Sequence, residues 1–125
     1  MMNTVALTEE TFENKVTRPG IVLVDWWASW CGPCRMFAPV FQAASDKHQD
    51  ITFGKVDTED QPGLAGAAQI TSIPTLMAFR DGILVFSRPG ALSAAGLEQV
   101  IQAVRNLDMG DIRDQLALQD KGAGQ

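Results

Sequence analysis

Hydrophobic residues recur along the chain with a period that changes from one segment to the next. Residues 21–27, IVLVDWW, are apolar at almost every position, which is typical of a central strand that is covered on both faces. Cys34, Phe37 and Phe41 then recur at helical spacing, so an amphipathic helix is expected there. Pro39 lies inside this helix and is expected to kink it, because its ring removes a backbone donor.

The flanking segments extend this alternation of strands and helices. Thr8 is the expected N-cap of a short helix, which Pro19 and Gly20 end. The stretch ITFGKVD, residues 51–57, predicts a second strand. Residues 60–68 predict a short, irregular helix, because a proline and two glycines weaken it. Strand and helix therefore alternate through the first half of the chain.

The second half of the chain contains a clear hairpin signal. In residues 75–90, two apolar runs flank Asp81 and Gly82, a dipeptide that favours a two-residue turn. Ser93 is a candidate N-cap for the next helix. The apolar stripe of that helix consists of Leu97, Val100, Ile101 and Val104. This order predicts an α/β fold with a mixed, largely parallel sheet, an antiparallel edge and helices on both faces.

Length and charge narrow the class of protein. A chain of 125 residues is most simply one domain, and its net charge of −5 argues against nucleic acid as a partner. The N-terminal residues resemble no signal peptide. The longest apolar run, residues 21–24, is too short to cross a membrane. We therefore expect a cytoplasmic monomer with neither nucleic acid nor membrane as a partner.

The only two cysteines, Cys31 and Cys34, flank Gly32 and Pro33 directly after the apolar strand. Three interpretations compete: a pair of small buried hydrophobic residues, half of a zinc site, or a redox dithiol. Zinc needs about four ligands, and only His48 could supplement the two sulfurs as a soft ligand. A Cys-x-x-Cys sequence at a strand-to-helix junction in a cytosolic chain favours the redox dithiol.

The local geometry assigns different roles to the two sulfurs. Pro33 is well suited to the first turn of a helix, where its missing N–H would be unpaired in any case. Cys31 then lies at the helix N-terminus, where free amides and the helix dipole favour its thiolate. Cys34 follows one turn later on the face that packs against the sheet. We therefore expect Cys31 to be exposed and reactive, Gly32 to leave it accessible, and Cys34 to be shielded.

The sequence around the two cysteines resembles that of the thioredoxin family. The segment WASWCGPCRMFAP is similar to the family's active-site segment, and the resemblance extends over residues 4–107. The other matching positions are Asp25, Pro39, Lys55, the loop Ile73-Pro74-Thr75, and Gly90-Ala91. The resemblance implies a thioredoxin fold, with a five-stranded mixed central sheet flanked by four helices, and protein-disulfide reductase activity.

The resemblance also divides the chain into two parts. Residues 1–108 are expected to form the thioredoxin domain, and residues 109–125 a polar C-terminal tail. Met109, Ile112 and Leu116 could line one face of a short helix there, with a frayed end. Trp26 stands where the family often has phenylalanine, a change that we expect to be tolerated if the indole N–H finds a partner.

Asp25 and Lys55 are the remaining candidates for chemistry. Asp25 is either a surface residue at a strand end or a buried carboxyl with a raised pKa that accepts the proton of Cys34. Lys55 is either a solvated edge residue or the cation near that carboxyl. The resemblance favours the second interpretation of each.

A substrate-docking surface follows from the resemblance as well. It implies a cis bond before Pro74, although most X-Pro bonds are trans. The surface surrounds Cys31 and consists of Trp30, Gly32, Pro33, Ile73, Pro74 and Gly90. Trp27 is expected to serve packing, and His48 to be a favourable residue near a helix end.

The resemblance implies thiol–disulfide exchange through a reversible Cys31–Cys34 disulfide. No bound cofactor and no metal are expected, since NADPH supplies electrons through a flavin-dependent thioredoxin reductase. The expected partners are that reductase and disulfide-containing proteins. Two alternatives remain: an oxidase or isomerase of the same fold, and a redox-inert interaction module. The Gly-Pro dipeptide argues against the first, and the retention of both sulfurs, Asp25 and Pro74 argues against the second.

Overall fold

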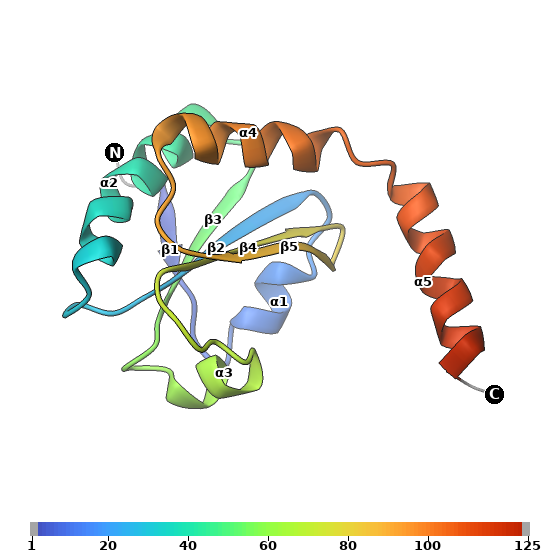
Figure 1. The fold of residues 1–125 in the computed structure, drawn as a ribbon, viewed down its shortest axis with the longest axis horizontal. Coiled ribbons are helices and arrows are strands. Elements are labelled where there is room, and N and C mark those ends of the chain that lie inside the picture. The colour runs from blue at the N-terminus through green and yellow to red at the C-terminus, as the bar shows by residue number, and fades with distance from the viewer. Residues whose placement is uncertain (1–2, 124–125) are drawn as a thin grey trace.

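The computed structural model describes residues 3–123, which form a five-stranded sheet and five helices (Figure 1). The elements are β1 (Thr4–Ala6), α1 (Phe12–Val16), β2 (Ile21–Trp27), α2 (Gly32–Lys47), β3 (Thr52–Asp57), α3 (Pro62–Ala67), β4 (Thr75–Arg80), β5 (Ile83–Pro89), α4 (Ala94–Arg105) and α5 (Met109–Ala123). The strand order is β1-β3-β2-β4-β5. The strands β1, β3 and β2 are parallel, whereas β4 and β5 join antiparallel, which confirms the predicted mixed sheet.

Strand β2 lies at the centre of the sheet and is buried on both faces, as its continuous apolar run predicts. Leu23 packs with Phe37 and Phe41 beneath α2 and α4. Val24 and Trp26 belong to a second cluster on the opposite face, the side of α1 and α3. The strand therefore separates two apolar layers, and its carboxyl end leads directly into the cysteine segment.

One local expectation is wrong, and the condition attached to another is not met. Helix α1 begins at Phe12 after Thr11, not after Thr8, because residues 9–11 form a turn. The amides of Thr11 and Phe12 donate to the Thr8 carbonyl across this turn. The indole Nε1 of Trp26 is buried and has no hydrogen-bond partner among the described residues. The ring instead packs 5.6 Å from that of Phe12, so apolar contact offsets the unmade hydrogen bond.

The hairpin and the cap of α4 form as predicted. Asp81 and Gly82 have φ angles of 53° and 81°, the left-handed conformation that a tight hairpin turn requires. Ser93 caps α4 by accepting a hydrogen bond of 3.0 Å from the Gly96 amide. Helix α2 continues through Pro39 to Lys47.

The C-terminal tail, for which the sequence allows a short or frayed helix, forms a fifth helix. Helix α5 spans Met109–Ala123 and projects from the body at the end farthest from the start of α2 (Figure 1). Met109 is buried at its base, whereas Leu116 and Leu118 are exposed. The guanidinium of Arg113 lies 3.3 Å from the carboxylate of Asp81, which ties the helix to the β4–β5 turn. No helix within residues 3–123 has the length and apolarity to span a membrane.

Candidate active site

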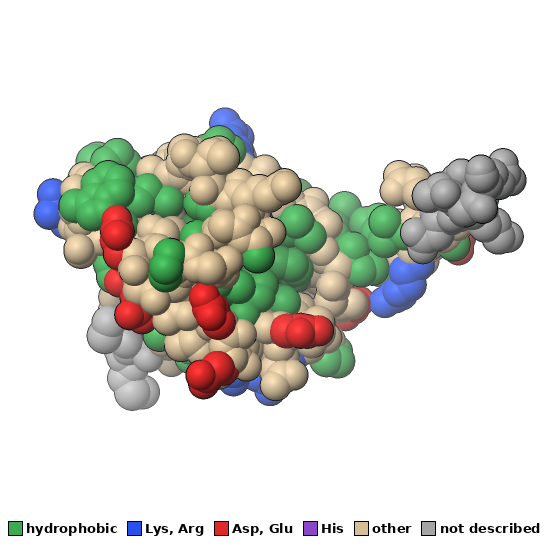
Figure 2. Space-filling view, turned by 90° about the horizontal axis from the view of Figure 1, so that it is seen from below, with side chains coloured by type: hydrophobic (Ala, Val, Ile, Leu, Met, Phe, Trp, Pro, Cys, Tyr) green, Lys and Arg blue, Asp and Glu red, His purple; other side chains and the backbone are tan. Residues whose placement is uncertain are grey.

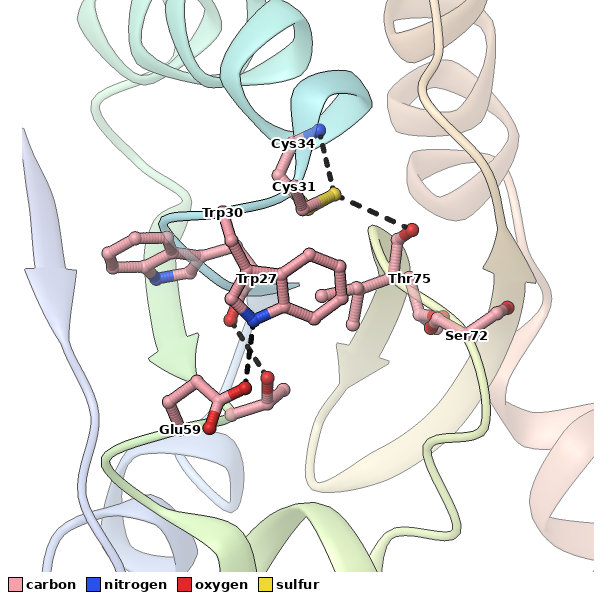
Figure 3. Close-up of a disulfide and its surroundings, with 9 residues drawn as sticks. Trp27, Trp30, Cys31, Cys34, Glu59, Ser72 and Thr75 are labelled. Carbon is pink, nitrogen blue, oxygen red and sulfur yellow. Dashed lines mark hydrogen bonds between the residues drawn. A yellow bond between two sulfur atoms is a disulfide. The ribbon is translucent and has the colours of Figure 1, made fainter.

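Cys31 and Cys34 are joined by a disulfide at the start of α2 (Figure 3). Cys31 is the N-cap in an extended conformation, and Pro33 occupies the first turn, as the sequence predicts. The Cys34 amide donates a hydrogen bond of 3.2 Å to the Cys31 sulfur. The same sulfur lies 3.7 Å from the carbonyl oxygen of Ile73. One free backbone donor of the helix N-terminus is therefore aimed at the sulfur that would carry negative charge as a thiolate.

In this oxidised form Cys31 is not exposed, contrary to expectation. Its exposed fraction is 4%, against 2% for Cys34, so both sulfurs of the disulfide are covered. The two differ in what adjoins them, since Cys31 lines an open groove of about 410 Å³ and Cys34 is not among its lining residues. The groove is lined by Trp30, Cys31, Gly32, Pro33, Thr58, Ile70, Thr71, Ser72 and Ile73.

Four of the six predicted docking residues line the groove, namely Trp30, Gly32, Pro33 and Ile73, whereas Pro74 and Gly90 do not. Trp30 is 64% exposed at one side, and a side chain added at Gly32 would meet no atom within 4 Å. The Ile73–Pro74 bond is cis, as expected. The Pro74 carbonyl accepts a hydrogen bond of 2.8 Å from Gly90, which brings the loop after β5 beside the cis proline. Hydrophobic side chains gather at this end of the molecule, at the left of Figure 2, above acidic ones.

Asp25 is fully buried, so it is not a surface residue at a strand end. Neither carboxylate oxygen has a hydrogen-bond partner among the described residues. Burial raises the pKa of Asp25 to about 6, and the positive charge of Lys55 partly opposes that rise. Asp25 is two residues from Leu23 in β2, so alternation places it on the face that α2 and Cys34 cover.

Lys55 lies on β3 directly beside Asp25 in the parallel register. Because β3 is flanked by β1 and β2, Lys55 does not occupy an edge strand, and the interpretation as a solvated edge residue fails. Its ammonium stands 5.0 Å from the centroid of the Trp27 ring. Trp27 therefore has a cation–π contact in addition to the packing expected of it.

The loop after β3 contributes two residues that the sequence analysis did not single out. The Thr58 amide and hydroxyl donate to the Trp27 carbonyl, at 2.8 Å and 3.1 Å. Glu59 accepts a hydrogen bond of 2.8 Å from the Trp30 indole (Figure 3). One signal was available: β2 and β3 are parallel neighbours, so the residues that follow them meet at the same edge of the sheet.

His48 is more than a favourable residue near a helix end. Its Nε2 lies 2.8 Å from a Glu98 oxygen, and its Nδ1 lies 3.1 Å from the Arg105 guanidinium. Arg105 also donates to both carboxylate oxygens of Asp50, which holds the pKa of that carboxyl below its ordinary value. This cluster joins the end of α2 to α4, and the length of α2 separates it from the cysteines.

Comparison with known proteins supports what this geometry indicates. The thioredoxin family model matches residues 3–103. The chain belongs to the thioredoxin family. A relative from Streptomyces coelicolor that is assigned to the thioredoxins is 51% identical over 124 residues, covering 99% of this chain and 92% of its own. A Mycobacterium tuberculosis thioredoxin is 41% identical over 110 residues, covering 84% and 93%.

Solved structures support the same fold. One chain, from a study of thiol resolution in yeast mitochondrial 1-Cys peroxiredoxin through the glutathione and thioredoxin systems, has a TM-score of 0.75 and 27% identity. The match covers 82% of this chain and 99% of that one. Family membership and the Cys31–Cys34 disulfide together make this chain a thiol–disulfide oxidoreductase, a protein-disulfide reductase.

Proposed function

We propose that Cys31 is the attacking sulfur and Cys34 the resolving one. The Cys31 thiolate attacks one sulfur of a substrate disulfide, so a mixed disulfide forms and the other substrate sulfur leaves as a thiolate. The Cys34 thiolate then attacks the Cys31 sulfur, which releases the second substrate thiolate and forms the Cys31–Cys34 disulfide. Two electrons pass from the dithiol to the substrate. The observation that supports this order is that Cys31 lines the groove and Cys34 does not.

Asp25 is the proposed proton acceptor for the Cys34 thiol. A pKa of about 6 leaves the carboxyl largely ionised at neutral pH, yet basic enough to accept a proton efficiently. Because its oxygens have no hydrogen-bond partner among the described residues, no other donor lowers the affinity of the carboxylate for the proton of Cys34. Lys55 keeps the carboxylate from becoming still more basic, since its charge favours the ionised form.

Trp30, Gly32, Pro33, Ile73, Pro74 and Gly90 are the proposed docking surface. A mostly apolar surface with a groove beside the reactive sulfur suits an extended protein segment that carries a disulfide. The Ile73 carbonyl lies beside the Cys31 sulfur, and the open space around Gly32 leaves room there for a substrate backbone.

Reduction of the Cys31–Cys34 disulfide needs an outside electron donor. We propose a flavin-dependent thioredoxin reductase that uses NADPH, with disulfide-containing proteins of the cytoplasm as the other partners. Residues 1–108 are proposed to suffice for both exchanges, because the family match ends at residue 103 and α5 lies at the far end from the cysteines. The Gly-Pro dipeptide continues to favour a reductase over an oxidase or isomerase.

Trapping tests the assignment of the two sulfurs. Cys34→Ser should accumulate mixed disulfides on Cys31, because the second attack is then impossible. Cys31→Ser is the matched control and should trap none. Equal trapping by the two variants, or trapping by the control alone, would reverse or remove the proposed roles.

A further inference from the structure

The loop between β2 and α2 is fastened at both ends by two adjacent residues of another loop. Thr58 donates twice to the Trp27 carbonyl, where β2 ends. Glu59 accepts from the Trp30 indole, one residue before Cys31. Figure 3 shows both sets of bonds on the same side of the cysteine segment. We call Trp27, Trp30, Thr58 and Glu59 together the Trp30 clamp.

Glu59 is itself held in position. The Asp57 carboxylate accepts hydrogen bonds from the amides of Glu59 and Asp60, at 3.0 Å and 3.4 Å. This is an Asx-type turn, which fixes the backbone of the loop before α3. The backbone from which the Glu59 side chain reaches the indole N–H is therefore fixed.

The indole that Glu59 holds would otherwise have few restraints. Trp30 is 64% exposed, so packing restrains its ring weakly, yet the ring lines the groove beside Cys31. An exposed aromatic ring that is free to rotate loses conformational entropy when a substrate orders it. A ring already held by a charge-assisted hydrogen bond has lost that freedom before the substrate arrives.

We infer that Glu59 is a positioning and specificity-determining residue: it holds the Trp30 indole as a preformed wall of the groove and so favours protein disulfides over small ones. A protein segment has to lie along this wall to bring its disulfide to Cys31. A small disulfide contacts the sulfur without needing the wall. This inference rests on the proposed function of the groove as the substrate site.

The test measures how fast each reduced variant is oxidised by two disulfides, insulin and bis(2-hydroxyethyl) disulfide. Glu59→Ala should lower the second-order rate constant for insulin by about three- to tenfold, the effect of losing one hydrogen bond, while the constant for the small disulfide stays within about twofold. Glu59→Gln keeps an acceptor oxygen and should restore most of the loss. Asp60→Ala removes a neighbouring charge that does not bond to Trp30, and it should match the unsubstituted protein.

Two further measurements separate positioning from a general loss of structure. In a Trp30→Phe background, Glu59→Ala should have no further effect, because the clamp is already broken. The Trp30 indole N–H resonance, assigned through Trp30→Phe, should exchange faster with solvent in Glu59→Ala and not in Glu59→Gln.

Each remaining outcome overturns the inference. Unchanged insulin rates in Glu59→Ala would show that the wall needs no anchor. An equal loss for both disulfides would mean that Glu59 supports the fold or the thiolate instead. A loss in Asp60→Ala as large as in Glu59→Ala would make the effect one of charge alone. If the protein without substitutions failed to reduce insulin, the proposed function would fail first, which is a distinguishable result.

Discussion

Replacing Asp25 with alanine should stabilise the oxidised protein, and by more at pH 8 than at pH 4. The carboxyl is fully buried, and burial raises its pKa from the ordinary value of 3.8 to about 6. For an acid whose pKa is raised by folding, the native state carries no penalty below the unfolded pKa. The penalty grows as pH rises between the two values and is complete above about 6.

The magnitude follows from the two pKa values. A difference between 3.8 and about 6, at about 1.4 kcal/mol for each tenfold change in acidity, costs the native state about 3 kcal/mol at pH 8. At pH 4 roughly 0.5 kcal/mol of this cost is already present, because the unfolded carboxyl is more than half ionised. The gain from Asp25→Ala should therefore be about 2.5 kcal/mol larger at pH 8 than at pH 4.

Urea unfolding of the oxidised protein, followed by tryptophan fluorescence at both pH values, measures this difference. Comparing two pH values cancels the cost of the cavity that alanine leaves, since that cost does not depend on pH. Asp50→Ala is a control of opposite sign, because hydrogen bonds from Arg105 lower the pKa of Asp50. Asp50→Ala should therefore destabilise the protein by more at pH 8 than at pH 4.

The reasoning is refuted if Asp25→Ala is no more stable, relative to the unsubstituted protein, at pH 8 than at pH 4. That outcome would mean that the carboxyl ionises in the fold at little cost. The same variant should reduce insulin more slowly at neutral pH, because the Cys34 thiol then lacks its proton acceptor. An undiminished rate would remove Asp25 from the mechanism even if the stability result held.

Three further predictions concern the site and the tail. In the reduced protein, iodoacetamide at neutral pH should label Cys31 at least about tenfold faster than Cys34, as mass spectrometry of the labelled peptides would measure, and equal rates would contradict the assigned roles. Gly90→Asp should slow the reduction of insulin about fivefold and leave the reduction of a small disulfide unchanged. The control Gly20→Asp, also at a glycine of positive φ with open space around it, should change neither rate. A loss of both rates in Gly90→Asp would show that Gly90 is structural. Truncation after Asp108 should leave the insulin rate unchanged and lower the free energy of unfolding in urea by no more than about 2 kcal/mol, since Met109 is the one described side chain of α5 that is buried. A larger loss would show that α5 is part of the folded core.

The sequence by itself determined the elements whose signals are local. The unbroken apolar run of β2, the helical spacing of Cys34, Phe37 and Phe41, and the Asp81-Gly82 turn each predict one element, and each element formed. The dithiol could be located for the same reason, because Pro33 and the helix N-terminus lie within three residues of Cys31. The resemblance of this segment to the thioredoxin family then predicted the fold and the chemistry.

Weak local signals gave one wrong detail, the cap of α1, and left the extent of the C-terminal helix open. Thr8 has a side chain that can cap a helix, but nearby residues compete for the same role, and Thr11 precedes the helix that forms. The tail has few apolar residues, and sequence alone could not show that burying Met109 and pairing Arg113 with Asp81 would fasten a complete helix to the body.

Only the tertiary structure decided the environment of each functional side chain. Asp25 is buried, with no hydrogen-bond partner among the described residues, because β3 and β4 flank β2 and α2 covers its face. None of these neighbours adjoins Asp25 in sequence. Cys31 is shielded and Trp30 is anchored because loops from three distant segments converge at one end of the sheet. Exposure, pKa and hydrogen-bond partners depend on which atoms surround a group in space, and the spacing of residues along a chain does not specify those atoms.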